Sequence, residues 1–176
     1  GLLREPLHGW SRSDLIVLMR VHLISIADRN AIVQKIKRYA PNTAIAETRI
    51  RANHLLQFDG QTEAIAKLKG QPVFVFCGIG NPENFNLTLE KLNCDIVGSE
   101  QYADHYHYQR SDLEHIKNSA QANKAAMIVC THKDLVKIGT NRLGGIPVYA
   151  VVVDVEFLSG EKELEEHLKK FARLQE

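Results

Sequence analysis

Residues 72–82 read PVFVFCGIGNP, a near-continuous apolar run that is followed by a glycine-rich turn. An apolar run of this length without polar alternation is typical of a central strand that is buried on both faces. Asn81 can cap a following helix, and Pro82 fits the first helical position, where a missing N–H costs nothing. The stretch therefore predicts a strand–turn–helix unit of an α/β fold.

The glycine turn looks like a loop that holds a nucleotide phosphate, but its chemistry does not fit. A Walker loop ends in Gly-Lys-Ser/Thr, and neither lysine nor hydroxyl follows Gly80. The dinucleotide fingerprint needs a third glycine, and counting from Gly78 that position falls on Glu83. A carboxylate there repels an anion. The pattern favours a structural turn, with a phosphate cradle as the alternative.

Strand-length apolar runs alternate with helical patterns along the whole chain, which predicts a Rossmann-like three-layer α/β domain with a largely parallel sheet flanked by helices. Strands are expected at residues 14–19, 43–58 (as an extended pair of segments), 72–78, 94–100, 125–131 and 147–155. Helices are expected at residues 27–40, 63–69, 82–92, 111–123, 132–138 and 160–176. The sequence SDLE at 111–114 has the spacing of a capping box.

The last predicted helix is amphipathic. Leu164, Leu168, Phe171 and Leu174 share one stripe, with acidic residues early and basic residues late. A contact with the core is the simplest interpretation of this stripe.

Length and charge narrow the class of protein. The 176 residues suit a single domain, 1–176, and the 22 basic residues against 21 acidic ones give no electrostatic reason to expect nucleic acid. The cysteines, Cys77, Cys94 and Cys130, lack metal or redox spacing and are expected to be reduced thiols. No apolar run is long enough to span a membrane, and the N-terminus lacks a signal-peptide layout.

Segments that follow predicted strands carry the candidate site residues, because ligands bind outside the carboxyl ends of parallel strands. Asp104 and His105 are adjacent, and His107 follows, so the loop suits acid–base chemistry, with a chance surface loop or a metal site made by these three as alternatives. Lys133 and Asp134 follow another strand, as a ligand contact or as an ion pair.

Near the start of the chain, Arg4 and Glu5 precede Pro6. Arginine binds phosphate with two parallel hydrogen bonds, and a carboxylate can hold a metal or a sugar hydroxyl. Ordinary solvated charges are the alternative interpretation.

The motifs GLLREPL with SRSDLIVL, VFVFCGIGNPENFNLTL, ADHYHY and CTHKDLVKI occur together in this order. From about Leu2 to Val155 they resemble the C-terminal half of the tetraacyldisaccharide 4'-kinase (lipid A 4'-kinase) family. The resemblance implies an enzyme that transfers the γ-phosphate of ATP, with Mg²⁺, to the 4'-hydroxyl of tetraacyldisaccharide 1-phosphate. It also implies that the ATP-binding P-loop belongs to an N-terminal domain that is absent from this chain. The chain alone is therefore expected to be inactive and to bind neither ATP nor Mg²⁺.

The resemblance assigns roles to residues that match the family motifs. Arg4 and Glu5 match a charged pair at the cleft that engages nucleotide or substrate. His105 matches the histidine that pairs with an aspartate of the N-terminal domain to activate the acceptor hydroxyl, and Asp104 is expected to orient it. Lys133 and Asp134 are carried over as substrate- or nucleotide-binding residues, with no metal ligand in this part. The glycolipid substrate implies work at the cytoplasmic face of the inner membrane.

The sequence departs from the family pattern at two positions. His132 stands where the family usually has glutamate, and Tyr106 stands where a second histidine often follows. Arg49 and Arg51, on one strand face, are weaker candidates for the substrate 1-phosphate. A non-catalytic Rossmann-like binding or scaffolding module is therefore the alternative function.

Overall fold

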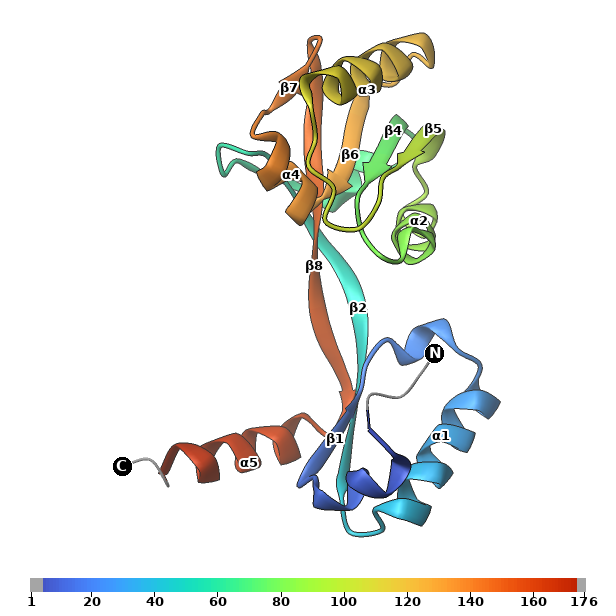
Figure 1. Ribbon diagram of the computed structural model, residues 1–176, viewed down its shortest axis with the longest axis vertical. Helices are drawn as coiled ribbons and strands as arrows, with labels where there is room; N and C mark the ends of the chain where they lie inside the picture. The colour runs from blue at the N-terminus through green and yellow to red at the C-terminus, as the bar shows by residue number, and fades with distance from the viewer. Residues whose placement is uncertain (1–4, 174–176) are drawn as a thin grey trace. The chain divides into compact units, whose positions relative to one another are not determined.

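The computed structural model describes residues 5–173. The chain divides into two compact units: unit 1 comprises residues 1–51 and 154–176, and unit 2 comprises residues 52–153. The chain crosses from one unit to the other within the long strands β2 (Ala44–Leu56) and β8 (Ile146–Ser159) (Figure 1). A single domain over residues 1–176 stays a prediction, because two units that share two strands can still belong to one domain.

Unit 2 contains a parallel sheet. Its strands are β4 (Pro72–Cys77), β5 (Asp95–Gln101), β6 (Met127–Thr131) and the first part of β8, in the order β8-β6-β4-β5. All three pairings in this order are parallel. Two short antiparallel strands are added: β3 (Thr62–Ala64) pairs with β2, and β7 (Arg142–Leu143) pairs with β8. The mostly parallel sheet that the sequence predicts is confirmed.

Helices cover both faces of this sheet. They are α2 (Pro82–Glu90), α3 (Arg110–Ala122) and α4 (His132–Ile138). Phe74 and Phe76 of β4 pack with residues of α3 and α4 in one buried cluster. Val73 and Val75, with the opposite side-chain direction, pack with α2 in a second cluster. The alternation of adjacent residues in PVFVFC thus supplies both cores of a three-layer arrangement.

Unit 1 has fewer buried hydrophobic side chains. Its elements are η1 (Leu7–Arg12), β1 (Leu15–Leu18), η2 (Val21–Leu23), α1 (Ile26–Tyr39), α5 (Glu161–Arg173) and parts of β2 and β8. Strand β1 pairs in parallel with β2. Its buried hydrophobic residues are Val21, Ile36, Ala40 and Ala46, and both hydrophobic clusters of the described chain consist of unit 2 residues.

Several local predictions are wrong. Residues 44–56 form one continuous strand rather than a pair of segments. The helix expected at 63–69 is replaced by β3 and a short 3₁₀ helix, Ile65–Leu68, because Thr62–Ala64 pair with β2. Helix α3 begins at Arg110, one residue earlier than expected. Its capping box is formed by Gln109 and Asp112 rather than by Ser111 and Glu114, and the Gln109 N–H donates to Asp112 Oδ2 at 2.7 Å.

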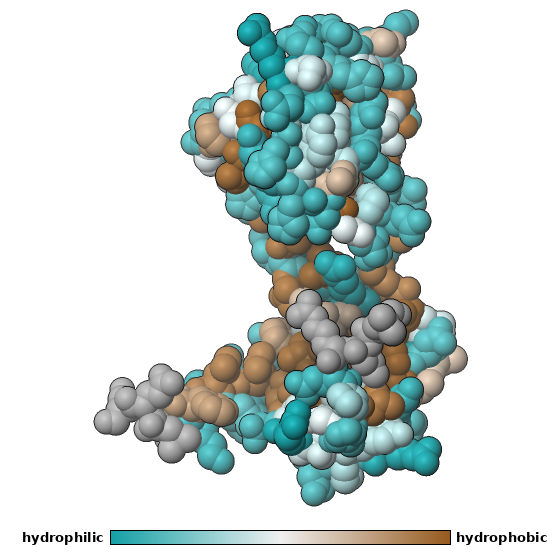
Figure 2. Space-filling model, viewed as in Figure 1, coloured by the Kyte–Doolittle hydropathy of each residue, from teal (hydrophilic) through white to brown (hydrophobic). Residues whose placement is uncertain are grey.

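The apolar stripe of α5 is not a core contact in this structure. Leu168 and Phe171 are each 59% exposed, and Leu174 lies outside the described residues. Figure 2 shows the apolar surface along this helix. The helix therefore forms with one apolar face largely open to solvent.

A partly buried ion pair lies in unit 1. Arg29 Nε donates to Glu47 Oε1 at 2.6 Å, a second bond joins Arg29 Nη2 to Glu47 Oε2, and Ser159 Oγ donates to Glu47 at 3.1 Å. Hydrogen bonding to Arg29 lowers the pKa of Glu47, although burial acts in the opposite direction.

The exposed and buried leucines of α2 provide a test of the unit 2 core. Leu89 is fully buried in the sheet cluster, whereas Leu87 of the same helix is 42% exposed. We expect Leu89→Ala to lower the free energy of unfolding by about 2–5 kcal/mol through the lost contacts and the residual cavity. Leu87→Ala should cost less than about 1 kcal/mol in the same urea titration. Equal losses would contradict the assigned packing of α2.

The Glu47 pair predicts a pH dependence of stability. Because the pKa of Glu47 is lowered in the folded chain, its stabilisation is present above the ordinary value of 4.5 and is lost as pH falls through the folded pKa. Glu47→Gln should flatten this acid-side loss in unfolding titrations, whereas Glu90→Gln, at an exposed position of α2, should not. An unchanged slope in Glu47→Gln would remove the pair from the account.

Candidate active site

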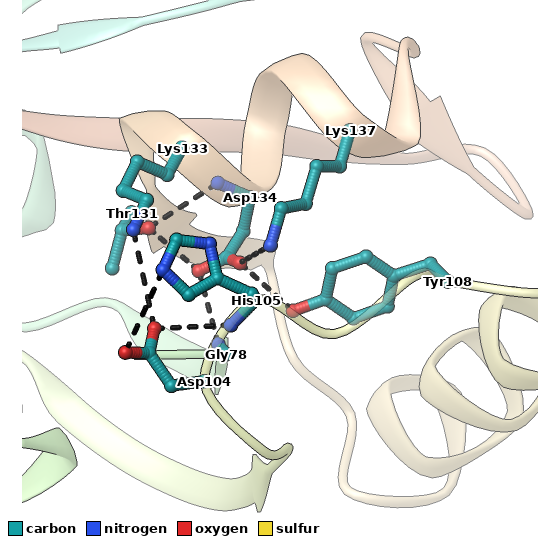
Figure 3. A network of polar contacts seen from close by, with 8 residues as sticks. All are labelled: Gly78, Asp104, His105, Tyr108, Thr131, Lys133, Asp134 and Lys137. Atoms are coloured by element: carbon teal, nitrogen blue, oxygen red, sulfur yellow. Dashed lines mark hydrogen bonds and ion pairs between the residues drawn. The ribbon is translucent and has the colours of Figure 1, made fainter. Parts of the chain in front are cut away.

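The carboxyl ends of three parallel strands bring the candidate residues of unit 2 together (Figure 3). Gly78 follows β4, Asp104 lies in the loop after β5, and Thr131 is the last residue of β6. Parallel strands place such segments at one edge of a sheet, where open α/β sheets bind ligands. The edge predicted from the sequence is thus a real cluster of polar groups.

Asp104 and His105 lie at the exposed surface of this cluster. The His105 side chain is 77% exposed, with Nε2 3.9 Å from Asp104 Oδ2. This distance is too long for a hydrogen bond. Instead, the backbone N–H of His105 donates to Asp104 Oδ1 at 3.0 Å. The carboxylate therefore fixes the backbone of His105 and leaves the imidazole open to solvent, and its expected role in orienting the ring stays a prediction.

The backbone of His105 is in an unusual conformation. Its φ is 61°, in the left-handed region that non-glycine residues seldom adopt. The turn is closed by the N–H of Tyr106, which donates to the carbonyl of Ala103 at 3.1 Å. Such a conformation costs about 1–3 kcal/mol and persists where surrounding contacts enforce it. The loop around His105 is therefore held by contacts outside the histidine itself.

Asp134 lies beneath this surface and has no exposed area. Its Oδ2 accepts hydrogen bonds from the Gly78 N–H at 3.1 Å and from Thr131 Oγ1 at 2.6 Å. Its Oδ1 accepts from the Tyr108 hydroxyl at 3.0 Å. The Asp134 carboxylate is thus engaged by donors of the protein itself, and its expected contact with substrate or nucleotide stays a prediction.

The other expected site residues belong to both units. Lys133 is exposed at the start of α4, with Nζ 3.9 Å from Asp104 Oδ1. Glu5 belongs to unit 1, where its carboxylate accepts a hydrogen bond from Arg12 at 2.8 Å. Arg4 lies outside the described residues. Lys133 is therefore the cation that the structure brings to the Asp104 loop.

Burial and the negative charge of Asp134 keep the neighbouring acids protonated. Burial, followed by the charge of Asp134, raises the pKa of the Tyr108 hydroxyl far above its ordinary value. The same two causes raise the pKa of Cys77 to about 11 and also raise that of Cys130. Tyr108 thus remains a hydrogen-bond donor at neutral pH, and Cys77 and Cys130 remain thiols rather than thiolates.

Sequence reasoning missed the tyrosines of the His105 loop. Tyr102, Tyr106 and Tyr108 contact one another with ring centroids 4.8–5.4 Å apart, and Tyr108 packs edge-on against Phe76 at 5.5 Å. The signal was present in the alternation YADHYHY, because the tyrosines turn inward while the histidines remain exposed.

The glycine turn is a structural turn. The Gly78 N–H that a phosphate would need is already bound to Asp134, and Asn81 Oδ1 accepts from the N–H of Asn84 at 3.2 Å as the predicted N-cap of α2. A carboxylate therefore occupies the place of an anionic ligand, in agreement with the preferred interpretation of the sequence.

Comparison with known proteins identifies the relatives of the chain. A profile of the family described as Tetraacyldisaccharide-1-P 4'-kinase (LpxK) matches residues 1–173. The chain belongs to this family. The tetraacyldisaccharide 4'-kinase of Halothermothrix orenii is 26% identical, over 97% of this chain and 48% of its own length. That of Chlorobium limicola is 32% identical, also over 97% of this chain and 48% of its own length.

A solved structure of the LpxK family shares the fold. The "apo" form LpxK from Aquifex aeolicus, in complex with ATP, matches with a TM-score of 0.59 and 21% sequence identity. The match covers 96% of this chain and 45% of that chain. The chain thus spans about half the length of the LpxK relatives that it matches.

Residues 5–173 contain neither a cluster of metal ligands nor a membrane-spanning helix. Between residues 5 and 173, no group of three or more histidine, cysteine, aspartate or glutamate side chains could hold a metal ion. A metal site made by Asp104, His105 and His107 is therefore not supported. Over the same residues, no helix has both the length and the apolar character that crossing a membrane requires.

The crowding around Gly78 predicts unequal effects of two glycine substitutions. A Cβ at Gly78 would lie 3.1 Å from the Tyr108 hydroxyl and 3.3 Å from the Ala103 carbonyl oxygen, whereas one at Gly80 would meet only Asp104, at 3.4 Å. Gly78→Ala should lower the free energy of unfolding by about 1–3 kcal/mol through overpacking, and Gly80→Ala by less than about 1 kcal/mol. Thermal unfolding measures both, and a tolerated Gly78→Ala would contradict the described turn.

Proposed function

We propose that this chain is the acceptor-side part of a tetraacyldisaccharide 4'-kinase. The complete enzyme would transfer the γ-phosphate of ATP to the 4'-hydroxyl of tetraacyldisaccharide 1-phosphate in lipid A biosynthesis. The observation that carries the proposal is the exposed His105 imidazole beside Asp104, at the carboxyl edge of the sheet. Membership of the LpxK family supports the same activity.

His105 is the proposed proton acceptor for the 4'-hydroxyl. Histidine is the side chain best suited to take a proton near pH 7, and its exposed ring leaves room for a hydroxyl to approach. The Asp104 carboxylate lies 3.9 Å from the imidazole Nε2. Phosphoryl transfer depends mainly on positioning and charge stabilisation. This proton transfer would therefore complement an aspartate supplied by the companion half of the enzyme, which is its N-terminal P-loop domain.

ATP and Mg²⁺ would be held mainly by that companion half. When bound, they supply the phosphoryl group and neutralise its charge. The 176 residues contain no Walker sequence, and the described residues offer no cluster of Mg²⁺ ligands, so no step is assigned to the metal here. The exposed Lys133 ammonium beside Asp104 is suited to a phosphate oxygen of nucleotide or substrate. Arg49, in contrast, already pairs with Glu156 at 2.6 Å.

Unit 1 supports the proposal of a companion half. The chain spans about half the length of its relatives, and unit 1 contributes no residue to either hydrophobic cluster of the described chain. Leu168 and Phe171 of α5 remain largely exposed. Exposed apolar side chains of this kind mark surfaces that another structure covers. An N-terminal P-loop domain is the proposed occupant.

The glycolipid substrate sets the proposed location. A disaccharide that carries four acyl chains resides in a membrane, because each buried methylene stabilises membrane association by about 0.8 kcal/mol. The complete enzyme would therefore act as a peripheral protein at the cytoplasmic face of the inner membrane.

A non-catalytic binding or scaffolding module is the second candidate. The observation that favours it is His132, an exposed histidine where the family usually has glutamate. This candidate predicts no phosphoryl transfer in any preparation, including one to which the P-loop half is supplied.

Two histidines of one loop test the proposed catalytic role. In the complete kinase, His105→Ala should lower kcat by about 10²–10⁴-fold, the range for loss of a general base. His107→Ala changes a second exposed histidine of the same loop and should leave kcat within about twofold. Transfer of labelled phosphate to tetraacyldisaccharide 1-phosphate measures both. An active kinase that is unaffected by His105→Ala would remove His105 from the mechanism, and inactivity of every preparation would favour the second candidate.

A further inference from the structure

Three segments at the edge of the unit 2 sheet donate hydrogen bonds to one buried carboxylate. Asp134 accepts from Gly78 of the β4–α2 turn, from Tyr108 of the β5–α3 loop and from Thr131 of the β6–α4 turn. All three bonds are 2.6–3.1 Å long, and the Asp134 side chain has no exposed area. A buried charge is tolerated only where such donors replace its lost water. Asp134 is therefore the common point of attachment of these loops.

Lys137 supplies a positive charge to this carboxylate. Its Nζ lies 4.0 Å from Asp134 Oδ1, one turn further along α4 (Figure 3). This nitrogen is buried and has no hydrogen-bond partner among the described residues. Its contact with the carboxylate is therefore electrostatic, within a poorly solvated environment.

The Tyr108 hydroxyl links Asp134 to the loop between β5 and α3, which contains His105 and is called the His105 loop. The loop is attached at its start by the Tyr102 N–H, which donates to the Cys77 carbonyl at 2.9 Å. It is attached near its end by the Tyr108 hydroxyl on Asp134. Between these two points, the side chains of Asp104 and His105 make no hydrogen bond to other loops or helices among residues 5–173. Asp104 bonds to the His105 N–H, and its contacts with His105 Nε2 and Lys133 are 3.9 Å long.

We infer that Asp134, acting through the Tyr108 hydroxyl, is the positioning residue for the His105 loop. Tyr108 and Asp134 hold the left-handed turn at His105 in place, with the Lys137 Nζ 4.0 Å from the same carboxylate. The catalytic consequence of this inference rests on the proposed function, whereas its structural consequence does not. Hydrogen bonds to a charged acceptor are about twice as strong as neutral ones, so removing the Tyr108 hydroxyl should release the loop.

The test compares two identical substitutions in the same loop. Tyr108→Phe removes the hydroxyl that reaches Asp134, and Tyr106→Phe removes one that reaches Asp112 at 3.2 Å. Amide hydrogen exchange at Tyr106, whose N–H closes the His105 turn, reports release of the loop directly. We expect exchange there to accelerate about tenfold in Tyr108→Phe, a change that corresponds to about 1.4 kcal/mol. In Tyr106→Phe, the amide of residue 106 should change less than about twofold.

The catalytic arm uses the complete kinase. Tyr108→Phe should lower kcat about tenfold with KM unchanged, and by more than Tyr106→Phe does, because the histidine is misplaced while substrate binding is retained. Equal exchange in the two variants would overturn the inference. Accelerated exchange in Tyr108→Phe together with no kinase activity in the unsubstituted protein would sustain the positioning role and overturn the proposed function. Accelerated exchange with an unchanged kcat in an active kinase would restrict Asp134 to stability and overturn the catalytic role.

Discussion

The buried carboxylate of Asp134 is the interaction on which the arrangement of the candidate site depends. It replaces the water that it lost on folding with an N–H and two hydroxyls from three separate loops. Each donor lies at or after the carboxyl end of a different parallel strand, so the sheet sets the spacing of the three segments. Their hydrogen bonds to Asp134 then hold them in contact with one another's turns. Removing any one donor would leave part of a buried charge without a partner, which costs more than the net value of the bond itself.

This constraint explains the glycine motif. Gly78 lies where the Tyr108 hydroxyl, the Ala103 carbonyl and Asp134 converge, and a side chain there would lie within 3.1–3.3 Å of all three. The turn is narrow because it accommodates a carboxylate of the protein itself, and its backbone N–H is used internally. The Asp134 carboxylate keeps the neighbouring Tyr108 hydroxyl and Cys77 thiol protonated. His105 and Lys133, in contrast, are exposed to solvent.

Sequence patterns predicted much of the fold because the strands of unit 2 are buried on both faces. PVFVFC and MIVC read as central strands for that reason, and the cap at Asn81 was visible as a short-range pattern. The 62–64 segment was missed because a strand partner, rather than local preference, decides its conformation. The stripe of α5 was misjudged because periodicity predicts an apolar face but does not say what covers it.

The exposed residues of the candidate site could be predicted from the sequence, whereas the residues beneath them could not. Asp104, His105 and Lys133 were found because charged residues after strands point to a ligand edge. Tyr108 and Lys137 were missed, since their roles depend on a buried partner that is 26 and 3 residues away, respectively, and only the fold brings Tyr108 and Asp134 into contact. The polar residues of unit 1, including Glu5, could not be related to this edge from sequence spacing.

Scalar coupling across a hydrogen bond tests the central claim most directly. In an NMR experiment on the isotopically labelled chain, the amide nitrogen of Gly78 should couple to the carboxylate carbon of Asp134. The coupling passes through the hydrogen bond from the Gly78 N–H to Asp134 Oδ2, whose N···O distance is 3.1 Å. The account predicts that this coupling is observed and that the Gly78 amide proton is protected from exchange with water. A Gly78 amide that exchanges freely and shows no coupling to Asp134 would contradict it.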